Sequence, residues 1–213
     1  MVSTKPKRAV ARSEEDRQAK LERILDAALD VFAEKGFADA RLDDVAARAG
    51  VAKGTVYLYV PSKQALFEAL IRSGIAVPIE TIEQRVARLD LPIEAVLRMI
   101  FGFIRQEVLG TRRHEIARLV ITEAGRFPEI AEFYHREVVS RGMRMLRDVA
   151  ERAAARGEIR SDELARFPQL AMAPALVAIL WANLFQRIDP IDVEAMLEAH
   201  LRLLMRALKG DAA

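Results

Sequence analysis

The chain has 213 residues, of which 52% are hydrophobic, and a formal net charge of +2 at pH 7. This length accommodates one large or two small domains with a real core, and the lack of cysteine excludes a disulfide framework and thiol chemistry. The net charge is too small to indicate nucleic-acid binding by itself, so only its local distribution is informative.

Residues 1–13 form a basic arm in which Lys5, Lys7, Arg8 and Arg12 precede any acidic residue. The arm lacks the apolar region of a signal peptide, and we expect it to be disordered and the protein to be cytoplasmic. Two roles remain open for the arm, which either reaches around DNA or is a solvated tail.

The first helix is expected from Glu14 to Lys35, with Gly36 as its stop. Its apolar positions recur with helical spacing and predict one buried face. These positions are Leu21, Ile24, Leu25, Ala28, Val31 and Phe32.

Residues 45–67 carry three basic residues, Arg48, Lys53 and Lys63, and no acidic one. Leu42 to Ala49 has helical apolar spacing, and Gly50 supplies the left-handed backbone that ends a helix. A second short helix is expected from Ala52 to Tyr59. The small and apolar residues between them predict a helix-turn-helix.

Burial of Val56 would turn the polar side chains of the second helix outward, where they can donate to phosphate oxygens. Gly54 would let the backbone approach a base edge, and Ser62 would cap the next helix, with Lys63 in its first turn. The predicted DNA contacts are Arg41, Lys53, Gly54, Thr55, Tyr57, Tyr59 and Lys63.

The stretch from Leu21 to Leu70 resembles the DNA-binding domain of the TetR family of bacterial transcription regulators. The matching positions are Gly36, Phe37, Asp44, Val45, Ala46, Ala49, Gly50, Val51, Lys53, Gly54, Thr55, Val56, Tyr57 and Tyr59. The resemblance implies a helix-turn-helix domain over residues 14–61 and a helical effector-binding and dimerisation domain over residues 62–213.

The chain departs from the family pattern at the recognition helix. Ala52 replaces a capping Ser, Leu58 a His, and Val60 the closing Phe. Ala40 and Arg41 stand where hydroxyl residues usually open the preceding helix, which Asp39 would cap instead. We expect these changes to alter individual contacts and the operator sequence, but not DNA binding as such.

The rest of the chain shows no alternating strand pattern, and the predicted fold is all-α with about nine helices. A fourth helix should run from Ser62 toward Leu89, kinked or split at Pro78. Local start and stop residues mark the later helices. These residues are Pro92, Thr111, Pro128, Gly157, Ser161 and the pair Asp189-Pro190.

Phe167 to Gln186 contains no charged residue. A membrane span is one interpretation, but five alanines, two prolines and three amide side chains make it a poor one. We expect a helix that closes the core on one face and meets a second subunit on the other, with no membrane as partner. The final helix carries a leucine stripe that would join it. The predicted dimer contacts are Leu180, Leu184, Leu197, Leu201 and Leu204.

Such a homodimer would place two recognition helices about 34 Å apart, on the two halves of a palindromic double-stranded operator. Aromatic and thioether side chains between these regions also predict a chamber for a small hydrophobic effector, although such residues are ordinary core as well. Glu123 is the expected polar group, unless it pairs with Arg105 or Arg141. The predicted ligand contacts are Phe103, Leu119, Glu123, Phe133, Met172 and Leu176.

Glu132 and His135 form the ExxH spacing of di-metal helical enzymes. Those sites need a second such motif, and His114 and His200 have no ligand spacing with this one. We therefore expect no metal, no cofactor and no catalysis. The segment from Glu115 to Val139 also resembles the effector domains of repressors of multidrug efflux, which implies release from DNA on ligand binding. A transcriptional activator and a ligand-independent DNA-binding protein remain alternatives.

Overall fold

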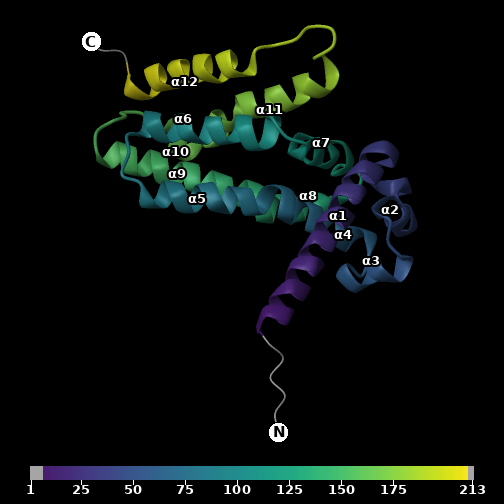
Figure 1. Ribbon diagram of the computed structural model, residues 1–213. Coiled ribbons are helices and arrows are strands. Elements are labelled where there is room, and N and C mark those ends of the chain that lie inside the picture. Colours follow the sequence, from purple (N-terminus) through teal and green to yellow (C-terminus); the bar gives the residue numbers. More distant parts are fainter. Residues whose placement is uncertain (1–6, 211–213) are drawn as a thin grey trace. The chain divides into compact units, whose positions relative to one another are not determined.

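The computed structural model describes residues 7–210, and side chains from residue 14 onward, and this part of the chain is all-α (Figure 1). It forms ten continuous helical segments and no strands, close to the nine helices expected. The chain divides into two compact units after Leu70.

The first unit contains helices α1 (Lys7–Asp39), α2 (Leu42–Ala49), α3 (Lys53–Tyr59) and most of α4 (Lys63–Ile71). Helix α1 begins earlier than the Glu14 expected, and residues 1–6 of the predicted basic arm lie outside the described residues. The helical backbone of α1 is interrupted at Gly36, whose φ of 71° and ψ of 171° agree with its predicted role as a stop.

An aromatic cluster explains why the division does not follow the expected domain boundary after Pro61. The ring of Phe67 on α4 packs edge-on against Phe32 and Phe37 of α1, with centroid distances of 5.1 and 5.3 Å. All three rings are buried. The first turns of α4 are therefore part of the core of the first unit.

The turn between α2 and α3 has the predicted helix-turn-helix geometry. Gly50 has a φ of 65°, and the Val51 amide donates to the Ala46 carbonyl at 3.0 Å. A Cβ on Gly50 would meet no other group within 4 Å, so the backbone conformation, rather than space, requires glycine there. The expected cap of α2 is wrong, because Asp44 accepts from the Arg41 amide at 3.3 Å and Asp39 takes no part.

The second unit is built from long helices, three of which contain a π-helical segment. Helix α4 continues through η1 (Arg72–Ala76) into α5 (Val77–Arg88), α6 (Ile93–Phe103) into η2 (Ile104–Leu109), and α8 (Pro128–Tyr134) through η3 (His135–Val139) into α9 (Ser140–Ala155). The remaining helices are α7 (Arg113–Glu123), α10 (Glu163–Arg166), α11 (Gln169–Leu184) and α12 (Val193–Lys209).

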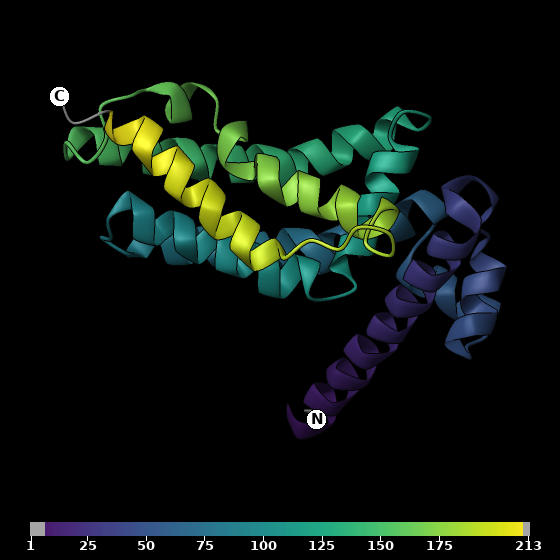
Figure 2. The same ribbon diagram turned by 90° about the horizontal axis from the view of Figure 1, so that it is seen from above.

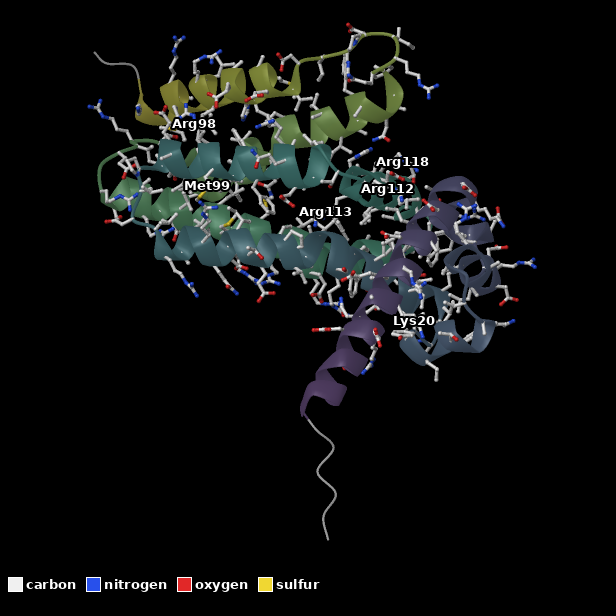
Figure 3. All side chains as sticks on the ribbon, in the orientation of Figure 1. Lys20, Arg98, Met99, Arg112, Arg113 and Arg118 are labelled. Carbon is white, nitrogen blue, oxygen red and sulfur yellow. The ribbon has the colours of Figure 1, made fainter. Side chains whose placement is uncertain are left out.

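Helices α5, α9, α6 and α12 are layered in that order (Figure 1), and α11 lies next to α12 (Figure 2). Arg98, which is labelled in Figure 3, lies on α6 and donates to Glu198 on α12 at 3.2 Å, and both side chains are exposed. Pro78 does not break its helix, because the π turn of η1 directly precedes it and Pro78 lies in the first turn of α5.

The leucine stripe of α12 faces inward, and three of the predicted dimer contacts are therefore wrong. Leu197, Leu201 and Leu204 are 3%, 1% and 9% exposed and belong to the core of their own subunit. The stripe packs against α6 of the same chain instead of being exposed to a second copy. Among the described residues, no helix combines the length and the apolar character that crossing a membrane requires.

Candidate nucleic-acid interface and ligand cavity

The recognition helix α3 exposes the side chains that its sequence predicts. Val56 is fully buried, whereas Lys53 and Tyr57 are exposed and Thr55 and Tyr59 are half-buried. No side chain caps the helix at Ala52, in line with the missing Ser. A Cβ on Gly54 would meet no protein atom within 4 Å, so the surface there is open to a close approach. Arg41, at the start of α2, is also exposed.

Two of the three basic residues in the acid-free stretch 45–67 pair with carboxylates on other helices. Arg48 makes two hydrogen bonds to the carboxylate of Glu34 on α1, at 2.5 and 2.8 Å. Lys53 pairs with Asp43 on α2 at 2.8 Å, which raises the pKa of the Lys53 ammonium. Because this second pair is largely exposed, it contributes little and a phosphate can replace the carboxylate.

Lys63 has a structural role that the sequence does not reveal. Its ammonium donates to the backbone carbonyl of Ala38 at 2.6 Å and lies 4.9 Å from the centre of the Phe37 ring. The predicted cap of α4 is confirmed, because the Ala65 amide donates to the Ser62 hydroxyl at 3.1 Å. Lys63 therefore holds the end of α1, and its phosphate contact stays a prediction.

The two apolar departures from the family pattern differ in their consequences. Val60 is 4% exposed, so the lost Phe concerns packing. Leu58 is 81% exposed on α3, between Tyr57 and Tyr59. An exposed apolar side chain on a recognition helix can contact a thymine methyl group. Leu58 is therefore an additional candidate base contact, which the sequence did not predict.

A cavity of about 130 Å³ lies inside the second unit. Its walls come from α5, α6, α7, α8, α9, α11 and the three π-helical segments. Three of the predicted contacts line it, namely Phe103, Met172 and Leu176.

The other three predicted ligand contacts are not among the lining residues. Leu119 is buried in the core, and Phe133 is buried between the guanidinium groups of Arg72 and Arg136, 5.3 and 5.1 Å from its ring centre. Glu123 is the last residue of α7 and is not among the residues that line the cavity. Arg105 and Arg141, its suggested partners, pair with other acids.

The polar group at the cavity is Tyr134, the last residue of α8. The sequence does not single out Tyr134, because nothing local distinguishes it from a core tyrosine. Burial raises the pKa of its hydroxyl to about 12, so the group is neutral at physiological pH.

Every π-helical segment contributes to the cavity wall. Ile75 belongs to η1, Ile104 and Val108 to η2, and Val138 to η3. Such segments are uncommon and occur frequently at functional sites, because their wider turn displaces side chains from the regular helical positions. Their concentration here distinguishes the cavity from an ordinary packing defect.

The two residues of the ExxH motif lie at the surface. Glu132 and His135 are both exposed, and His135 contacts the Ser140 hydroxyl at 3.3 Å through Nδ1. In the described part of the chain, no three acidic or histidine side chains are grouped so that they can hold a metal ion.

A short recognition helix held by a glycine turn, followed by a larger helical unit with an internal cavity, defines the class of helix-turn-helix regulators with a sensor domain. Residues 24–70 match the family model of bacterial regulatory proteins of the tetR family, and residues 93–200 match the tetracyclin repressor-like C-terminal domain. The chain belongs to the TetR family of DNA-binding transcriptional regulators, and its relatives are regulators rather than enzymes.

Individual relatives agree with this assignment. The uncharacterised HTH-type transcriptional regulator YvdT of Bacillus subtilis is 40% identical over 96 residues, and the match spans 45% of this chain and 47% of YvdT. The structure of FadR from Bacillus subtilis in complex with stearoyl-CoA shares the fold, with a TM-score of 0.71 and 22% identity over 88% of this chain and 98% of FadR. The flavonoid-responsive regulator FrrA is 27% identical, with a TM-score of 0.61 over 92% of this chain and all of FrrA.

Proposed function

We propose that the protein is a homodimeric repressor that binds a palindromic operator in the cytoplasm and leaves it when a small hydrophobic molecule enters the cavity. The cavity carries this proposal, because an apolar chamber lined in part by three π-helical segments is the kind of space in which small hydrophobic molecules bind.

The relatives support control by small molecules. One similar structure is described as a complex with stearoyl-CoA, and another regulator as flavonoid-responsive. The two named compounds differ in size and charge. The relatives therefore support the existence of an effector for this chain without indicating its chemistry.

A second copy of the chain is the partner that the outer face of α11 fits. Val177, Leu180 and Leu184 are 45%, 44% and 62% exposed and follow one another at helical spacing, and Leu203 on neighbouring α12 is 64% exposed. Leu180 and Leu184 therefore stay proposed dimer contacts. Two copies of this α11–α12 face would form a four-helix interface about a two-fold axis, which matches a palindromic operator.

The helix from Lys63 to Arg88 provides a route from the cavity to the DNA-binding unit. Its first turns are anchored to the core around Phe67, and farther along Ile75, Ile79 and Ile82 line the cavity. A ligand that prefers one position of these isoleucines would shift the helix and change the separation of the recognition helices in the dimer. Typical couplings of this kind are about 1 to 3 kcal/mol.

A glycine at the cavity wall allows a test that needs no ligand. Gly142 on α9 lines the cavity, and a Cβ built there would meet no atom within 4 Å. Gly142→Leu should fill the space and act as a permanent ligand. We expect it to bind the operator about 5- to 150-fold more weakly than the original chain, as measured by fluorescence anisotropy on DNA selected from a random duplex library.

Gly102→Leu is the matched control. Gly102 on α6 also has nothing within 4 Å of a built Cβ, but it does not line this cavity. Equal operator affinities for the two variants would contradict release through the cavity and favour a ligand-independent DNA-binding protein. Tighter binding by Gly142→Leu would favour a regulator that its ligand recruits to DNA, such as an activator.

A further inference from the structure

The cavity has an unusually simple chemistry. Tyr134 supplies the one polar side chain among the residues that line it, and the other walls are aliphatic, aromatic or thioether groups such as Ile100, Phe103 and Met172. No Lys, Arg, His, Asp or Glu is among these described lining residues. A ligand inside therefore meets one hydroxyl group and otherwise apolar surface.

The Tyr134 hydroxyl has no hydrogen-bond partner among the described protein groups, although protein atoms surround the side chain closely enough to raise its pKa. The side chain retains some accessible surface, which agrees with a position facing the cavity. The hydroxyl is not closed off, because among the described residues no fully buried side-chain N or O atom lacks a hydrogen-bond partner. Tyr134 therefore offers the cavity an accessible donor that a polar group of a ligand can use.

Size limits the ligand further. The volume of about 130 Å³ is below the range typical of pockets for drug-sized molecules, which begins at about 300 Å³. It is comparable to a dry apolar cavity of about 150 Å³ that, in another protein, binds benzene. One ring with a small substituent is the scale that fits.

We infer that the effector is a small, neutral, mostly hydrocarbon molecule of about one-ring size with a single oxygen that pairs with the Tyr134 hydroxyl. This inference rests on the proposed function, since it names the chemistry of the molecule that fills the same cavity. A carboxylate of the same size is excluded, because no cation on the wall compensates the loss of its hydration.

Three probes with one skeleton separate the contributions of shape, hydrogen bond and charge. They are para-cresol, toluene and para-toluate, each titrated by calorimetry into the purified full chain. We expect para-cresol to bind about two- to tenfold more tightly than toluene, which corresponds to one neutral hydrogen bond. The anion para-toluate should bind at least about tenfold more weakly than para-cresol, since it must be desolvated without a partner.

Two variants locate the effect. Tyr134→Phe should remove the preference for para-cresol over toluene and leave toluene binding unchanged. Gly142→Leu should abolish binding of both, because it fills the cavity, while Gly102→Leu should bind both as the original chain does.

Tightest binding of para-toluate, retention of the para-cresol preference in Tyr134→Phe, retention of binding in Gly142→Leu, or failure of all three probes to bind would each overturn the inference. The proposed function fails separately. If para-cresol binds as expected but leaves the operator complex intact, the ligand chemistry holds and release from DNA does not.

Discussion

At the scale of single residues, the basic side chains that the helix-turn-helix sequence offers for DNA all have partners within the protein. Arg48 pairs with Glu34 and Lys53 with Asp43, and Lys63 caps the carbonyl of Ala38. The three side chains differ in how easily each can leave its partner in the protein to contact a DNA phosphate. Lys53 is the most exposed of the three and has only an exposed carboxylate to leave.

Lys53→Ala should weaken binding to all duplex sequences similarly, because it removes a phosphate contact without changing a base contact. The dependence of log K on log salt should fall by about one per protomer. Affinities measured over a range of salt concentrations check this. Arg88→Ala, which removes the same charge from α5, should leave the slope unchanged, and an unchanged slope in Lys53→Ala would contradict the phosphate contact.

Lys63→Met should act first on stability. It keeps much of the side-chain volume but removes the charged donor to Ala38, which should lower the free energy of unfolding by about 1 to 2 kcal/mol. Urea denaturation measures this difference. A variant with unchanged stability and a salt slope lowered as much as in Lys53→Ala would restore Lys63 as a simple phosphate ligand.

The Arg48–Glu34 pair predicts a dependence of stability on pH. Hydrogen bonding to Arg48 lowers the pKa of Glu34 below its ordinary value of 4.5. The folded chain therefore binds this proton less readily than the unfolded chain, and the stabilisation is present above pH 4.5 and lost as pH falls through the lowered pKa. Glu34→Gln should lose less stability than the original chain below pH 4.5 in thermal melts, and Glu22→Gln on the same helix serves as control. Parallel acid profiles of Glu34→Gln and the original chain would contradict this role.

At the scale of helices, the pattern of apolar residues predicted the elements better than their partners. Helical spacing located α1, α2, α3 and α12, but the same leucine stripe on α12 fits a subunit interface and a core equally well. Only the packing of α12 against α6 decides between them, and that contact joins distant parts of the sequence. The uncharged helix α11 has two apolar faces, of which one is buried and one is exposed.

Substitutions on the two helices separate interface from core. Leu184→Glu should convert the dimer to a monomer in sedimentation experiments and leave the fold intact, since Leu184 is 62% exposed. Ile121→Glu, on the exposed side of α7, should remain dimeric. Leu197→Ala should instead lose about 2 to 5 kcal/mol of stability, because it leaves a cavity in the core. A dimeric Leu184→Glu variant would place the interface elsewhere.

At the scale of the whole molecule, the local motif was predictable and the sensor chemistry was not. Gly50, Val56 and the exposed face of α3 follow from contacts within a few residues. The cavity depends on helices far apart in the chain and on three π-helical segments, for which no sequence signal was found. Glu123 is therefore the residue that local polarity indicated, whereas Tyr134 is the residue that the fold brings to the cavity.

The most direct test of the account is the symmetry of the DNA that the purified full chain selects from a random duplex library, read by sequencing and footprinting. A homodimer with one recognition helix per protomer predicts two inverted half-sites whose centres lie about 34 Å apart, both protected at the same protein concentration. Selection of a single asymmetric half-site, or of no sequence at all, would contradict it.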